Sequence, residues 1–113
     1  MTLRGVHELD QALSDSHIRP VLFFKHSHTC GVSAEALDEL RSHIDGQVSS
    51  SLAQYAMVTV QTHRELSNAI TERLGVRHET PQVILVRDGR VLWSASHFRV
   101  NVAELGKAVA AAV

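Results

Sequence analysis

The chain has a single cysteine, Cys30, and its type and place make it the best candidate for chemistry. Cys30 follows the short apolar run 21–24 and precedes a segment with helical spacing of apolar residues, so it lies where a strand passes into a helix. The first turn of a helix presents unpaired N–H groups and the positive end of the helix dipole, which favour thiolate over thiol. Its neighbours are polar or small, which disfavours the alternative of a buried, inert cysteine. We therefore expect a reactive thiol that attacks disulfide sulfur.

Ser33 occupies the position that the second cysteine holds in a Cys-x-x-Cys redox motif, because the local sequence is Cys-Gly-Val-Ser. A hydroxyl at this position can donate a hydrogen bond to a thiolate, but it cannot form a disulfide. A local hydrogen bond to the backbone in the first helical turn is the other role open to this serine, and the two are compatible. We expect monothiol chemistry, with Cys30 and Ser33 as catalytic residues and a thiol of another molecule as the resolving group.

Thr80-Pro81 precedes the third predicted strand. This turn should lie beside the carboxyl end of the first strand, and so beside Cys30. An X-Pro bond in such a turn is either cis or the ordinary trans bond of a strand start, and both remain open at this point.

Histidine is frequent, at 8 of 113 residues, and His26-x-His28-x-Cys30 has the composition of a zinc site. In an extended segment, however, side chains two residues apart are separated by about 6.5–7 Å, and a fourth ligand such as His97 would be needed. We predict no metal, and we expect protonation of His28 to tune the thiolate. Four other histidines are predicted to lie on or beside helix surfaces: His7, His17, His43 and His63.

The elements that position these residues follow from hydrophobic periodicity and turn signals. Strands are predicted at 21–25, 55–60, 82–86 and 91–95, with an Asp-Gly turn joining the last two. Helices are predicted around 6–13, from Cys30 towards Val48 with Gly46 near its end, from a capping box at Thr62 to a left-handed cap at Gly75, and from Asn101 to about 112.

The order of these elements predicts a single α/β domain, 1–113. The strand–helix–strand unit 21–60 should form a right-handed parallel crossover, whereas the 82–95 hairpin is antiparallel. A mixed four-stranded sheet with helices on both faces satisfies both requirements. The expected strand order is 55–60, 21–25, 82–86, 91–95.

Composition excludes several function classes. Eleven basic and twelve acidic residues give a net charge of −1, and only five residues are aromatic, so nucleic acid is not an expected partner. No apolar run approaches the roughly 20 residues that span a bilayer, and the first ten residues lack a signal-peptide pattern. A lone cysteine is typical of a reducing compartment, so we expect a cytoplasmic protein without a membrane partner.

The segment from Phe23 to Ala34 resembles the signature of the YtxJ-like monothiol bacilliredoxins, in which Lys, His or Asn, and Ser precede Cys-Pro-Ile-Ser. The similarity continues in Thr80-Pro81-Gln82, in the hairpin 87–90 and in 94–98, and covers nearly the whole chain. The resemblance implies a thioredoxin-like fold with an N-terminal helix. It also implies removal of bacillithiol from mixed disulfides on oxidised client proteins, with Cys30 as nucleophile and Pro81 as a cis proline. No cofactor is implied beyond bacillithiol, or another low-molecular-weight thiol, as co-substrate. The residues expected to surround the thiol in this fold and bind the substrate are Lys25, His28, Thr29, Gly31, Thr80, Pro81 and His97.

One departure from that signature favours an alternative. Gly31 replaces the proline after the cysteine, and Cys-Gly-Val-Ser is similar to the Cys-Gly-Phe-Ser motif of monothiol glutaredoxins, which implies an iron–sulfur cluster completed by an external thiol. Val32 in place of Phe, and 94–99 in place of a Gly-Gly-x-Asp segment, disfavour that alternative. A non-catalytic adaptor with an inert cysteine is the third possibility.

Overall fold

The computed structural model of the chain describes residues 2–46 and 53–113. The elements are α1 (Val6–Asp15), β1 (Val21–His26), α2 (Gly31–Asp45), β2 (Gln54–Thr59), α3 (Arg64–Leu74), β3 (Gln82–Arg87), β4 (Arg90–Ser96), the 3₁₀ helix η1 (His97–Arg99) and α4 (Val102–Ala112). Among the described residues, no helix is long and apolar enough to cross a membrane.

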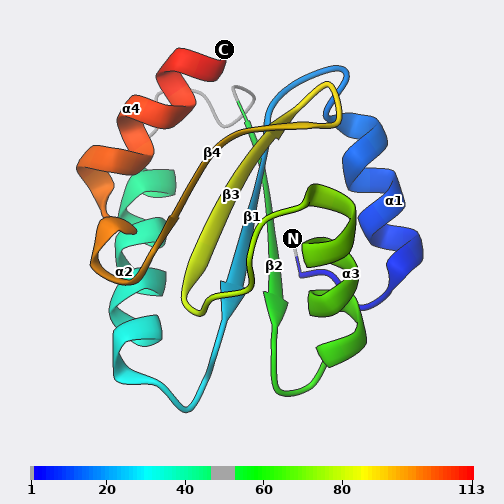
Figure 1. Cartoon of the computed structure of the whole chain (residues 1–113). Helices are drawn as coiled ribbons and strands as arrows, with labels where there is room; N and C mark the ends of the chain where they lie inside the picture. Colours follow the sequence, from blue (N-terminus) through cyan, green and yellow to red (C-terminus); the bar gives the residue numbers. More distant parts are fainter. Residues whose placement is uncertain (1, 47–52) are drawn as a thin grey trace.

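The four strands form one mixed sheet in the order β2-β1-β3-β4 (Figure 1). β1 runs parallel to β2 and antiparallel to β3, and β4 returns antiparallel beside β3. The predicted strand order and the predicted mixture of directions are both confirmed.

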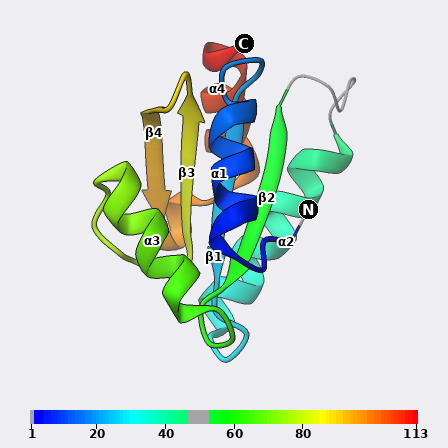
Figure 2. The ribbon, with the colours of Figure 1, turned by 90° about the vertical axis from the view of Figure 1, so that its right-hand side faces the viewer.

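Helices cover both faces of the sheet, α2 and α4 on one face and α1 and α3 on the other (Figures 1 and 2). The central strand β1 is buried over its first five residues, as expected of a strand covered on both sides. Its side chains alternate between the two cores. Val21 and Phe23 pack in the core that includes residues of α1 and α3, whereas Leu22 and Phe24 pack in the core that includes residues of α2 and α4.

Two local predictions were wrong. Thr62 does not cap α3, which begins one residue later than a Thr62 cap requires: His63 is the N-cap and no side chain caps it. The hydroxyl of Thr62 contacts the Thr59 carbonyl and His63 Nδ1 instead. His43 is not on the surface but only 3 % exposed, because α2 packs on the sheet along this face and His43 Nε2 lies 2.8 Å from the Tyr55 hydroxyl.

The ends of two helices agree with the turn residues in the sequence. α2 ends at Asp45 with Gly46 as its C-cap, and Val48 lies outside the described residues. α3 ends at Gly75, whose φ of 67° is the left-handed conformation that glycine adopts at little cost. The segment 76–81 then leads from this cap to β3 along the edge of the sheet at which β1 ends.

Candidate active site around Cys30

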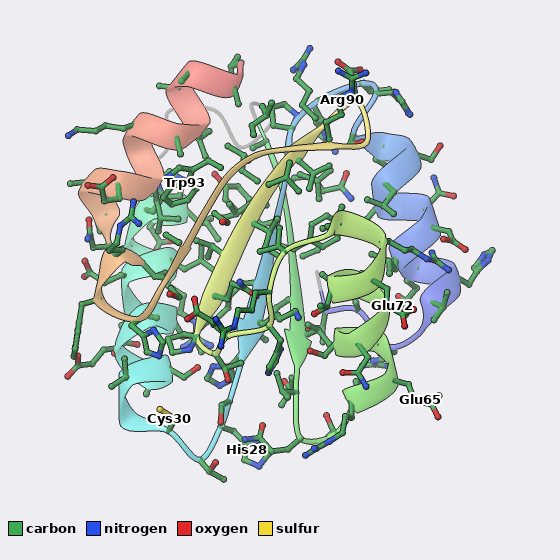
Figure 3. The ribbon with its side chains drawn as sticks, in the orientation of Figure 1. His28, Cys30, Glu65, Glu72, Arg90 and Trp93 are labelled. Atoms are coloured by element: carbon green, nitrogen blue, oxygen red, sulfur yellow. The ribbon has the colours of Figure 1, made fainter. Side chains whose placement is uncertain are left out.

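Cys30 is the N-cap of α2 and has an extended backbone, φ −112° and ψ 124°. Its carbonyl accepts the first hydrogen bond of the helix from Ala34 N at 3.1 Å. Figure 3 shows the residue at the start of α2, just beyond the carboxyl end of β1, with His28 in the connecting loop. The side chain is partly exposed, and its sulfur has no hydrogen-bond partner among the described residues. The predicted strand-to-helix position of Cys30 is therefore confirmed, and the residue is partly exposed there.

Ser33 lies one helical turn further on, but its hydroxyl is directed to the end of β1. The residue is fully buried, and its Oγ accepts a hydrogen bond from Ser27 N at 2.9 Å. The same oxygen lies 2.9 Å from His26 Nδ1. Of the two roles open to this hydroxyl, the structure shows a hydrogen bond to the backbone and none to the Cys30 sulfur. Ser33 instead ties the first turn of α2 to the strand that precedes the cysteine.

His26 completes this small network. Burial lowers the pKa of His26 below its usual value, and the charges of His28 and Arg41 act in the same direction. A lowered pKa favours the neutral imidazole, whose Nδ1 can accept the Ser33 hydroxyl proton when the ring proton is on Nε2. The ring also stacks at a tilt on Phe24, with centroids 5.7 Å apart.

Gln61, in the turn between β2 and α3, is a site residue that the sequence analysis missed. Its Nε2 donates to the hydroxyl oxygens of Ser27 and Thr29, and its Oε1 accepts from His28 N at 3.3 Å. One side chain thus holds all three residues of the loop before Cys30. The available signal was topological: parallel neighbours β1 and β2 end at the same edge of the sheet, so a polar residue after β2 meets the loop after β1.

A second loop reaches this edge from β3. The Thr80–Pro81 peptide bond is cis. Lys25 pairs with Gln82 in the sheet, so Pro81 lies beside the end of β1. The Pro81 carbonyl in turn accepts from His97 N at 3.0 Å, which links the cis-proline loop to η1.

η1 and the start of α2 border a groove of about 180 Å³. Val32, two residues after the cysteine, lines this groove together with His97 and Phe98. His97 has a positive φ of 56°, and the Phe98 ring is 72 % exposed. An exposed aromatic ring and an exposed imidazole therefore stand on the α2 side of the cysteine.

The predicted substrate-binding residues separate into two groups. His28, Thr29, Gly31 and His97 are exposed and Thr80 is partly exposed, all on loops or helix ends near the carboxyl end of β1, with the buried Pro81 among them. Lys25 is different, because its side chain is fully buried on the α3 side of the sheet. Its ammonium therefore has no exposed surface with which to meet a carboxylate. In residues 2–46 and 53–113, no group of three or more His, Cys, Asp or Glu side chains is arranged to hold a metal ion.

A central β1 with a cysteine at its end, a helix starting there and a cis proline across from it define a thioredoxin-fold thiol redox protein. Solved structures agree. A protein described as a candidate oxidoreductase with a thioredoxin fold matches with a TM-score of 0.83 and 28 % identity, over 96 % of this chain and 91 % of that one. Thioredoxin from Fasciola hepatica matches with a TM-score of 0.78 and 13 % identity, over 99 % and 98 %. A thioredoxin variant from Halobacterium salinarum matches with a TM-score of 0.76 and 20 % identity, over 99 % of this chain and 88 % of that one.

The particular family follows from the sequence itself. The profile of the family described as "Monothiol bacilliredoxin BrxC" matches residues 1–105. The chain belongs to the monothiol bacilliredoxin family. The resemblance seen around Cys30 is thereby confirmed, and with it a function in thiol redox chemistry.

Proposed function

We propose that the chain is a cytoplasmic monothiol oxidoreductase that removes a low-molecular-weight thiol, bacillithiol in the first place, from mixed disulfides on oxidised proteins. The observation that carries this proposal is the partly exposed Cys30 at the start of α2, with a buried serine in the place of a resolving cysteine. A site of this kind can accept a small thiol but cannot expel it with a second thiol of its own.

The reaction balances as two thiol–disulfide exchanges. The Cys30 thiolate attacks the small-thiol sulfur of the client mixed disulfide, forming a new disulfide and releasing the client thiolate, which takes a proton from water. A thiolate from a second small thiol or a reductase then attacks the small-thiol sulfur of that disulfide. Cys30 leaves as thiolate, and the small thiol departs in a disulfide with the attacking thiol.

The exposed rim of the site suits an anionic small thiol. Bacillithiol carries a malate group, and the exposed His28 and His97 supply imidazole donors on the loops around the cysteine. Thr29, Gly31 and Thr80 add polar side-chain or backbone groups on the same edge. Lys25 is left out of this binding set because its ammonium is buried.

The test uses a client protein with one bacillithiolated cysteine, mixed with the reduced chain and followed by intact mass. We expect the client to lose the small thiol while the chain gains it at Cys30. Cys30→Ser should show neither change. The same client carrying glutathione reports the choice of small thiol. If Cys30 alkylates readily but takes neither thiol from the client, the proposal is wrong.

The iron–sulfur alternative is tested with the same preparation. Incubated without oxygen with iron, sulfide and small thiols, the chain should stay colourless and free of cluster. A stable brown dimer would favour cluster binding over de-thiolation as the function. The cluster would then be held by Cys30 from two chains and by two external thiols.

A further inference from the structure

Lys25 is a cation in the core of the molecule. Its side chain is fully buried, although it belongs to the central strand β1. No carboxylate pairs with it: the ion pairs in the described part of the chain are Arg73–Asp10 and His17–Asp88, both elsewhere. Burial lowers the pKa of Lys25 to about 8. A buried ammonium without an anion costs folding free energy, and an apolar side chain of similar length would avoid this cost.

The contacts of Lys25 show what it holds. Its Nζ donates to Thr71 Oγ1 at 2.7 Å and lies 3.1 Å from His78 Nδ1. Thr71 lies in the last turn of α3, before the left-handed cap at Gly75. His78 lies in segment 76–81, which leads to Pro81. One ammonium therefore joins the end of the helix to the middle of the segment that follows it.

Gln82 holds the same segment from the neighbouring strand. Its Nε2 donates to the Arg77 carbonyl at 2.8 Å, and its Oε1 accepts from Glu79 N at 3.4 Å. Lys25 and Gln82 are direct partners in the β1–β3 register. Two adjacent side chains of the sheet thus fix residues 77–79.

We propose that Lys25 is a positioning residue, which holds segment 76–81 and, through it, Pro81 and His97 beside Cys30. The link runs from Lys25 Nζ to His78, along the chain to Pro81, and from the Pro81 carbonyl to His97 N. The consequence for catalysis rests on the function proposed above, whereas the consequence for the segment does not. The buried cation lowers the stability of the fold, and in return it holds segment 76–81 in a fixed position beside the site around Cys30.

The test compares Lys25→Met with Lys107→Met, which removes the other, exposed lysine of the chain. We expect Lys25→Met to unfold at a higher denaturant concentration than the parent. Amide hydrogen exchange in 76–80 should nevertheless become at least about tenfold faster, since the segment opens without global unfolding. Removal of the small thiol from the client should slow by roughly tenfold, as expected when one positioning hydrogen bond is lost. Lys107→Met should change none of the three.

A second pair of variants, at His78, tests the proposal independently in case Lys25→Met does not fold. Asn at position 78 offers a side-chain oxygen in the place of Nδ1, so His78→Asn should keep slow exchange and full activity, whereas His78→Leu should lose both. Unchanged exchange in 76–80 for Lys25→Met and His78→Leu would overturn the proposal. Fast exchange in these variants, with no transfer even by the parent chain, would uphold the positioning and overturn the proposed function.

Discussion

Ser33 occupies the position of the second cysteine in a redox motif, but its hydroxyl makes structural hydrogen bonds. Its hydroxyl joins Ser27 N and His26 Nδ1 at the end of β1, and no bond reaches the Cys30 sulfur. Because the side chain is fully buried, water cannot replace it as the partner of the Ser27 amide. The serine therefore ties the first turn of α2, which follows the cysteine, to the end of the strand.

Ser33→Ala should accordingly reduce stability more than reactivity. Leaving the buried Ser27 amide without its acceptor should lower the free energy of unfolding by about 1–3 kcal/mol. The pH dependence of Cys30 alkylation should stay within experimental error of the parent. Denaturant unfolding and iodoacetamide kinetics measure the two effects, with the exposed helical serine substituted in Ser42→Ala as control. A clear upward shift of the alkylation profile would instead mean that the hydroxyl serves the thiolate directly.

At the scale of the elements, the site is built from the segments that adjoin one end of all four strands. The loop after β1 carries Cys30, and Gln61 in the turn after β2 holds that loop by contacts with three consecutive residues, 27–29. From the other side, Pro81 before β3 bonds to η1 after β4. Each loop of the site is thus held by a neighbour that is distant in sequence.

Gln61→Met tests the first of these contacts, because methionine keeps the length of the side chain without its amide. We expect Cys30 alkylation and client de-thiolation to slow by roughly tenfold, because the three hydrogen bonds from Gln61 to the loop disappear. Global stability should fall by no more than about 1–2 kcal/mol, since the side chain lies at the edge of the molecule. Gln11→Met, on the exposed face of α1, is the matched control. Unchanged kinetics in Gln61→Met would show that the loop keeps its conformation without the hydrogen bonds of Gln61.

At the scale of the whole molecule, four basic side chains have pKa values below their usual ones. Burial is the largest cause that lowers the pKa values of His26, His43 and His78, and that of Lys25. Around His78 the charges of Lys25 and Arg64 add to the lowering, and Glu79 opposes it. In every case the folded state binds its proton less readily than the unfolded state.

Stability should therefore rise with pH in two separate windows. The folded pKa values of the three histidines lie below the unfolded value of about 6.5, so stability is lost as pH falls from there through the folded values. Lys25 has a folded pKa of about 8 against 10.5 when unfolded, so stability gained above about pH 8 is absent at neutral pH. Denaturant midpoints measured from pH 5 to 9.5 should show both rises, with a flat region near neutrality. Lys25→Met should remove the alkaline rise and leave the acid one, and an alkaline rise that persists in this variant would contradict the assignment.

The order of the elements, the sheet topology and the place of Cys30 could be predicted from the sequence. Apolar periodicity, the Asp-Gly turn and Gly75 are local signals, and a short strand–helix–strand connection allows essentially one crossover. The motif around the cysteine likewise lies in one continuous segment.

The partners of the polar side chains depended on the tertiary structure. Alternation along β1 places Lys25 on the same face as Val21 and Phe23, but only the packing of α3 on that face brings Thr71 and His78 to its ammonium. The hydrogen bonds of Gln61 to the loop after β1 and the burial of His43 likewise depend on the packing of elements against one another. Each is a contact between elements far apart in the chain, made by a single side chain whose direction and partner no local pattern specifies.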